Sequence, residues 1–262
     1  MSKIVLRSRL LKSSRYNSNK KIGITRTDIR TNYFISKLHK IHYIVFRNIQ
    51  TNMKSENWKN KGKIITVFGK KLFVIDEGNS EETLVILHGY PTSSYDYYKV
   101  LDQLSKQYRV IIHDHLGFGF SDKPIMYSYS LIEQAEVALQ LWKQLGITKV
   151  TLLAHDYGTS VCTEILARYN TKQIDLQINQ LILCNGSVHI ELSQLRSIQK
   201  LLKSKLTGKW VAKLTSYPIF RKNLRNVYFD KTQATENELK EMWFQLEHNN
   251  GRKVIHLLSN YI

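Results

Sequence analysis

An aspartate stands where the sequence predicts a sharp turn between a buried strand and a helix. Asp156 follows the apolar run 150–154 and precedes the stretch 158–169, in which apolar residues recur every three or four positions. A carboxylate exposed on such a turn can attack carbon and form a covalent ester, so that one difficult displacement becomes alkylation followed by hydrolysis. Ala154 and Gly158 are small, which suits a turn where backbone segments approach closely. The alternative is an aspartate that only caps the helix.

Two further segments with polar residues and glycines follow earlier apolar runs. The segment 88–96 (His-Gly-Tyr-Pro-Thr-Ser-Ser-Tyr-Asp) comes after the run 83–87, and the segment 114–122 comes after the run 109–112. In a parallel sheet, ligands bind at the edge formed by the carboxyl ends of the strands. Both segments are therefore expected to lie beside Asp156 at that edge.

The surrounding pattern predicts the elements that position these segments. Residues 64–68 and 71–75 read as a hairpin joined at Gly69 and Lys70. Four short apolar runs predict buried strands, and the stretches between them have helical spacing. The predicted strands are 83–87, 109–112, 150–154 and 181–184, and the predicted helices are 96–107, 131–145 and 158–169. Alternating strands and helices indicate an α/β fold with a mostly parallel sheet and helices on both faces.

The three polar segments, in this order and on these elements, resemble the α/β-hydrolase superfamily, and specifically its Asp-nucleophile branch of epoxide hydrolases and haloalkane dehalogenases. The resemblance covers residues 57–262 and includes the stretches 58–62, 118–124, 242–243 and 249–251. It implies an α/β-hydrolase core followed by a helical cap.

The resemblance divides the chain into a basic N-terminal extension (1–56), the N-terminal part of the hydrolase core (57–186) and a helical cap region (187–262). Within the cap region, Leu202, Leu206, Trp210 and Leu214 recur every four residues. This spacing predicts one cap helix over 200–215 that buries an apolar face, with Gly208 in its middle.

The resemblance also implies the site residues. Asp156 matches the nucleophile, and the backbone N–H groups of Tyr90 and Tyr157 match the oxyanion hole. His155 matches a structural position. Haloalkane dehalogenases bind the leaving halide with a Trp after the nucleophile and often an Asn after His-Gly, whereas this chain has Tyr157 and Tyr90 there. An epoxide-hydrolase-like activity is therefore favoured.

Opening an epoxide additionally needs acids that protonate the alkoxide, normally two tyrosines of the cap. Tyr217, Tyr228 and Tyr261 lie in the cap region and are the candidate proton donors, with packing as the alternative role of each.

The family's catalytic acid and histidine lie on strands that follow the cap. His189, His248 and His256 all fall within the cap stretch, and the alternative acid position after the last predicted strand holds Asn185 and Gly186. The sequence is thus expected to be truncated after the cap, without the C-terminal strands, and inactive alone.

Charge is concentrated near the N-terminus. Residues 1–63 contain 16 Lys or Arg and two acids, which gives +14 of the net +18. The first 27 residues contain no acid, which suits a mitochondrion-like transit peptide or a disordered basic tail. A cytoplasmic location is expected, with an organelle as the alternative. The most apolar stretch there, 41–46, is too short for a transmembrane span.

Three functions stay open: a hydrolase acting on a small organic molecule, a non-catalytic binding or regulatory protein on the same fold, and a basic arm that associates with RNA or a membrane. We expect a small-molecule partner and no nucleic acid. The sequence contains no metal-ligand cluster and no phosphate-binding glycine loop, so no metal and no cofactor are expected.

Overall fold

The described part of the chain comprises residues 53–186 and 195–261 of a computed structural model. The interpretations that concern residues 1–52, including the transit signal and most of the basic arm, lie outside it, as does His189. The described residues belong to one compact unit.

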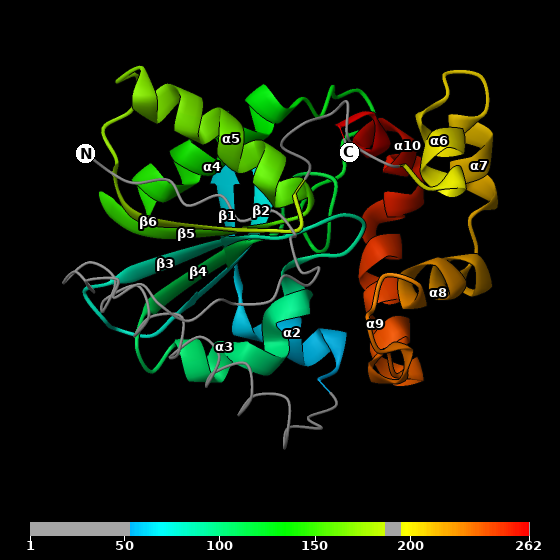
Figure 1. Ribbon diagram of the computed structural model, residues 1–262, viewed down its shortest axis with the longest axis horizontal. Coiled ribbons are helices and arrows are strands. Elements are labelled where there is room, and N and C mark those ends of the chain that lie inside the picture. The colour runs from blue at the N-terminus through cyan, green and yellow to red at the C-terminus, as the bar shows by residue number, and fades with distance from the viewer. Residues whose placement is uncertain (1–52, 187–194, 262) are drawn as a thin grey trace, which may run out of the picture. The chain divides into compact units, whose positions relative to one another are not determined.

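Six strands form one mixed sheet in the order β1-β2-β4-β3-β5-β6 (Figure 1). The strands are β1 (Lys63–Val67), β2 (Lys70–Glu77), β3 (Thr83–Leu87), β4 (Arg109–His113), β5 (Lys149–His155) and β6 (Gln177–Cys184). β1 and β2 form the predicted hairpin, and β2 pairs antiparallel with β4. The pairs β3–β4, β3–β5 and β5–β6 are parallel. The predicted strands and the mostly parallel sheet are confirmed.

Helices cover both faces of the sheet, as the alternating pattern predicts. Figure 1 shows α4 (Leu131–Gln144) and α5 (Tyr157–Asn170) on one face, and α2 (Ser55–Lys61) and α3 (Tyr98–Leu104) on the other. Side chains of β3 alternate between the two sides. Val85 and Leu87 belong to the core on the α4 and α5 side, whereas Leu84 and Ile86 belong to the core on the other side. A strand buried on both faces therefore reads as a continuous apolar run.

The last part of the chain is helical. It comprises α6 (Ser197–Lys203), α7 (Gly208–Leu214), α8 (Tyr217–Arg225), η3 (Lys231–Gln233), α9 (Glu236–Glu247), η4 (His248–Lys253), α10 (Ile255–Leu258) and η5 (Ser259–Tyr261). Most apolar side chains of these helices join the core on the α2 and α3 side, whereas Val254 and Leu258 join the core on the α4 and α5 side. The cap thus extends a core that the sheet has already begun.

Polar contacts also fasten α9 to the segments around it. The backbone N–H of Ser55 donates to Glu241 (2.7 Å), and the Ser93 hydroxyl donates to Gln245 (2.7 Å). Lys99 on α3 forms an ion pair with Glu238 (2.8 Å). The helix α9 is therefore bound by residues of α2, of the loop after β3 and of α3.

The prediction of a single buried helix over 200–215 is wrong. The chain leaves helical geometry between Lys203 and Gly208, so that α6 and α7 are separate elements. A Cβ at position 208 would lie 2.2 Å from the Leu202 carbonyl oxygen, which shows how closely the two elements pack. Only Leu202 of the predicted apolar face is buried, with 6% of its surface exposed. The other three residues of that face point to solvent, because the break turns α7 relative to α6.

Trp58 on α2 offers a test of this packing. Its side chain is fully buried, its indole N–H donates to the Ser94 hydroxyl (3.1 Å), and its ring meets the edge of Tyr95. Trp58→Ala is expected to lower the free energy of unfolding by about 3–5 kcal/mol because it leaves a large cavity. Denaturant unfolding followed by circular dichroism measures the change.

Trp210→Ala is the matched control, since 65% of that side chain is exposed. It is expected to change the same free energy by no more than about 0.5 kcal/mol. Equal losses for the two variants would contradict the packing of α2.

Candidate active site

Asp156 occupies a strained turn between β5, which ends at His155, and α5, which begins at Tyr157. Its backbone has φ 49° and ψ −116°, a conformation that residues with a side chain seldom adopt. A Cβ at Gly158 would lie 2.3 Å from the Leu87 carbonyl oxygen, so only glycine fits where α5 passes β3. The predicted sharp turn is confirmed, and the close approach of β3 explains why position 158 is a glycine.

Two backbone N–H groups converge on a single oxygen of the Asp156 carboxylate. The Tyr157 N–H donates to Oδ1 at 2.7 Å, and the Tyr90 N–H donates to the same oxygen at 2.8 Å. The structure therefore brings together the three groups that the resemblance assigns to nucleophile and oxyanion hole, from two loops 66 residues apart in the chain. The other oxygen, Oδ2, accepts neither of these bonds.

Gly89 allows the loop after β3 to come this close. A Cβ at position 89 would lie 2.8 Å from Cβ of Asp156 and 3.0 Å from Nδ1 of His155. The contact explains why a residue without a side chain precedes Tyr90.

Buried histidines fix the backbone behind this loop. His88 is bonded through Nδ1 to the Gly89 carbonyl (2.9 Å), and its Nε2 accepts the N–H of His115 (3.0 Å). Burial lowers the pKa of His88. Both ring nitrogens are occupied by backbone partners, so His88 positions the loop. Burial likewise lowers the pKa of His155, the neighbour of the nucleophile.

Two tyrosines that the sequence did not suggest as proton donors lie within reach of the Asp156 charge. Burial raises the pKa of both Tyr90 and Tyr97, and the Asp156 carboxylate raises it further. The Tyr90 hydroxyl is bonded to the Ser259 hydroxyl (3.0 Å). Tyr97 ends the helix η1 (Ser94–Tyr97). Both residues follow the His-Gly pair at the end of β3, and this position is the feature of the sequence that could have identified them.

Asp96, beside Tyr97, is a second acidic group near the site. Its Oδ1 is buried without a hydrogen-bond partner among the described residues, while Oδ2 accepts a hydrogen bond from the Thr92 hydroxyl. Burial raises the pKa of Asp96 to about 7, and the charges of Glu238, Asp114 and Asp156 add to the effect.

The side chain of Tyr157 points into the core, although its N–H belongs to the site. The ring is buried against Phe118 and His115, with centroids 5.3 and 5.6 Å away. Its hydroxyl is buried and has no hydrogen-bond partner among the described residues. The position where a dehalogenase would present a halide donor therefore presents only backbone here.

The three candidate cap tyrosines lie in different environments. The Tyr217 hydroxyl donates to Glu236 (2.6 Å). Tyr228 is half-buried, and desolvation raises its pKa, as do the charges of Glu238 and Asp96. None of the hydrogen bonds of the described residues joins these hydroxyls to Asp156, so their role as proton donors stays a prediction.

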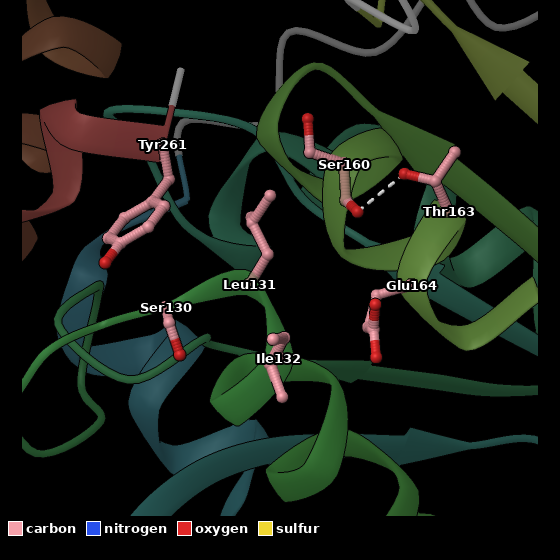
Figure 2. A pocket seen from close by; sticks show the side chains of 7 residues that line it. All are labelled: Ser130, Leu131, Ile132, Ser160, Thr163, Glu164 and Tyr261. Carbon is pink, nitrogen blue, oxygen red and sulfur yellow. Dashed lines mark hydrogen bonds between the residues drawn. The ribbon is translucent and has the colours of Figure 1, made fainter. Parts of the chain in front are cut away.

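Tyr261 lines an open pocket of about 440 Å³ between the start of α4 and α5 (Figure 2). Ser130, Leu131 and Ile132 at the start of α4 and Ser160, Thr163 and Glu164 on α5 form the rest of its wall. Asp156 and Tyr90 are not among the lining residues. The pocket is thus separate from the carboxylate and its two N–H donors.

None of the hydrogen bonds of the described residues joins His248 or His256 to Asp156. His248 packs against Phe120 with ring centroids 5.1 Å apart, and burial lowers its pKa to about 4. Burial also lowers the pKa of His256. After β6, Asn185 has φ 52°, and a Cβ at Gly186 would collide with the Thr159 side chain. Within residues 53–186 and 195–261, no three His, Cys, Asp or Glu side chains converge as metal ligands would.

Comparisons with known proteins agree with this architecture. A family model described as the α/β hydrolase fold matches residues 82–233. The mesoderm-specific transcript protein of Mus musculus is 40% identical over 214 residues, which cover 79% of this chain and 64% of that protein. The chain therefore spans slightly less than two thirds of the length of this relative.

Solved structures show the same fold at low sequence identity. The epoxide hydrolase CorEH aligns with a TM-score of 0.63 and 20% identity, over 77% of this chain and 73% of CorEH. The haloalkane dehalogenase DatA from Agrobacterium tumefaciens C58 aligns with a TM-score of 0.63 and 20% identity, over 76% of this chain and 67% of DatA.

The raised pKa of Asp96 predicts how stability depends on pH. The native state holds the Asp96 proton up to about pH 7, whereas the unfolded chain releases it near its ordinary value of 3.8. The native state therefore binds more protons in this window, and stability falls as pH rises from about 4 to about 7, by at most about 1.4 kcal/mol per pH unit. Asp96→Asn, which stays neutral, is expected to remove this slope.

Thermal unfolding at a series of pH values checks the expectation, with the exposed Asp175→Asn as control. The Tm advantage of Asp96→Asn over the unchanged protein should grow between about pH 4 and about pH 7 and level off above it. A constant difference would mean that Asp96 is ionised throughout this range.

Proposed function

The chain belongs to the α/β-hydrolase superfamily, and from this premise we propose that it attacks an epoxide-like small organic molecule with the Asp156 carboxylate. The observation that carries the proposal is the pair of N–H bonds to Asp156 Oδ1, at 2.7 and 2.8 Å. A carboxylate that only capped α5 would not need the second donor, which comes from the distant loop after β3.

Because both N–H groups donate to Oδ1, the two oxygens of the Asp156 carboxylate have different roles. Oδ1 is held, so Oδ2 is the oxygen that attacks carbon. In the resulting ester, Oδ1 becomes the carbonyl oxygen. When water later adds to Cγ, the negative charge develops on Oδ1, where the two N–H groups already point. The same geometry therefore serves both half-reactions.

In the first half-reaction, the carboxylate opens the epoxide ring. Oδ2 forms a bond to one ring carbon of the epoxide, the bond between that carbon and the ring oxygen breaks, and its electron pair stays on the oxygen. The alkoxide then takes a proton from a tyrosine hydroxyl. Tyr90, whose backbone N–H contacts Asp156, and Tyr97, which lies seven residues further along the segment after β3, are the donors that we favour. The cap tyrosines Tyr217, Tyr228 and Tyr261 are the alternative.

The second half-reaction needs a base that activates water. We assign this base to none of residues 53–186 and 195–261. His88 in particular is not free to accept a proton from water, because both of its ring nitrogens are bonded to backbone groups. We therefore assign to the described residues the alkylation of Asp156 and the stabilisation of the oxyanion.

An epoxide fits the site better than a haloalkane. A leaving halide needs N–H donors in the place where Tyr157 follows the nucleophile, and the Tyr157 ring is buried against Phe118 and His115. An alkoxide needs a proton, which tyrosines can supply.

Covalent labelling of Asp156 tests the nucleophile without requiring turnover. Incubation with a styrene-oxide-type epoxide is expected to add one substrate mass to the intact protein, located on Asp156 by peptide mass spectrometry. Asp156→Asn should remove the adduct, because an amide oxygen is a poor nucleophile, and should change Tm little.

Asp175→Asn is the matched control and should label like the unchanged protein. Reversible binding of the epoxide, seen as a rise in Tm with no adduct at Asp156, would instead support a non-catalytic binding protein. Labelling of Asp156→Asn at the normal rate would remove Asp156 from the mechanism.

The proton donor is tested by the rate of the same labelling. Tyr97→Phe is expected to slow the addition at least about tenfold, because the alkoxide then loses a positioned acid. Tyr169→Phe on α5 is the control and should label at the normal rate. A slower reaction in Tyr217→Phe together with a normal rate in Tyr97→Phe would return the role to the cap.

A further inference from the structure

The outer side of the cap carries three large apolar side chains in a row. Leu206, Trp210 and Leu214 expose 86%, 65% and 73% of their surfaces. They are spaced four residues apart, in the turn before α7 and on α7 itself, so they lie on one side of the helix. We call these three residues the apolar ridge.

The chain around the ridge is strongly basic. Residues 192–229 contain no Asp or Glu, and nine Lys or Arg fall within 196–225. Four of these lysines flank the ridge directly in sequence: Lys203, Lys205, Lys209 and Lys213. The Lys213 ammonium lies 5.9 Å from the centre of the Trp210 ring. The ridge therefore lies in a stretch of chain whose charged side chains are all cationic.

The inner side of α7 is already used for packing. Ala212 is buried in the core on the α2 and α3 side, and Gly208 packs against the Leu202 carbonyl. α7 contacts α6, α10 and η4. Figure 1 shows α6 and α7 at the edge of the cap that faces away from the sheet. The ridge thus faces outward because the opposite side of the helix is fixed.

We propose that the apolar ridge and its lysines dock on an anionic phospholipid surface. Leu and Trp side chains enter the boundary between headgroups and acyl chains, and Lys side chains reach the phosphate and carboxylate groups of the headgroups. Trp is favoured at this boundary because its ring is apolar and its N–H is polar. The docking is peripheral, since no helix of the described residues is long and apolar enough to cross a bilayer.

The composition of the ridge favours lipid over nucleic acid. A single-stranded nucleic acid is bound by aromatic rings on which bases stack, within a basic groove. Two of the three ridge residues are leucines, which offer no stacking surface. Leucine side chains of this exposure gain free energy instead by leaving water for an acyl environment.

The helix that carries the ridge contacts an element next to a residue bonded to the candidate active site. α7 packs on α10, and Ser259, directly after α10, is bonded to the Tyr90 hydroxyl. The docking itself does not depend on Asp156 or on any chemistry there.

Vesicle binding by the full chain tests the proposal. Co-sedimentation is measured with phosphatidylcholine vesicles that contain or lack phosphatidylserine. The triple variant Leu206→Ser, Trp210→Ser, Leu214→Ser is compared with the double variant Ile125→Ser, Met126→Ser, which removes exposed apolar residues from the core domain. The triple variant is expected to lose about tenfold or more in partitioning onto anionic vesicles, and the double variant to bind normally. An unchanged Tm in both variants shows that they fold.

A second readout reports on the ridge alone, because residues 1–52 also carry positive charge. Brominated acyl chains quench only indoles that reach the membrane. The quenching seen with the unchanged protein should disappear in Trp210→Phe. Lys209→Glu, Lys213→Glu should weaken binding and reduce its salt dependence.

Three outcomes would overturn the proposal. One is equal vesicle binding by the triple and double variants with no Trp210 quenching. Another is binding to single-stranded RNA but not to vesicles, with loss of RNA binding in the triple variant. The third is a dimer that dissociates in the triple variant, without vesicle binding by the unchanged protein.

Discussion

The candidate site depends on one carboxylate oxygen that accepts two backbone N–H bonds. Hydrogen bonds to an ionised acceptor are stronger than those between neutral groups, and here they also fix which oxygen is free. The arrangement costs backbone strain at Asp156, whose φ is positive, and it tolerates no side chain at Gly89 or Gly158. These requirements act together: the turn after β5 can present its carboxylate only if the loop after β3 passes within hydrogen-bond distance.

Buried polar side chains hold that loop in place. Asp114 at the end of β4 accepts the N–H of Ser94 and that of Phe120, each at 2.7 Å. His88 links the loop to the backbone of His115. The segments after β3 and β4 are therefore joined by charge-assisted or buried hydrogen bonds, whose loss would leave unpaired polar groups in the core. The same connections keep the Tyr90 N–H directed at Asp156.

The C-terminal helices pack into both cores of the sheet, and α6 and α7 join the one on the α2 and α3 side, which explains which of their surfaces is left outside. Leu202 and Ala212 are buried, whereas Trp210 between them in the chain is exposed. A short pair of helices cannot bury all its apolar residues when one side is fixed against α10 and η4. The exposed residues are surrounded by lysines, so the inner and outer sides of α7 have different chemistry and serve different contacts.

The sequence by itself determined the strands, the helices around them and the turn at Asp156, because short apolar runs and glycine positions reflect local backbone geometry. The resemblance to the α/β-hydrolase superfamily, carried by three sequence segments, also pointed to both N–H groups. Only the tertiary structure decided that both donors meet on one oxygen and that burial raises the pKa of Asp96. It also decided that residues 200–215 form two helices rather than one. Spacing every four residues specifies one side of a helix, but whether that side meets a core or water depends on neighbours distant in sequence.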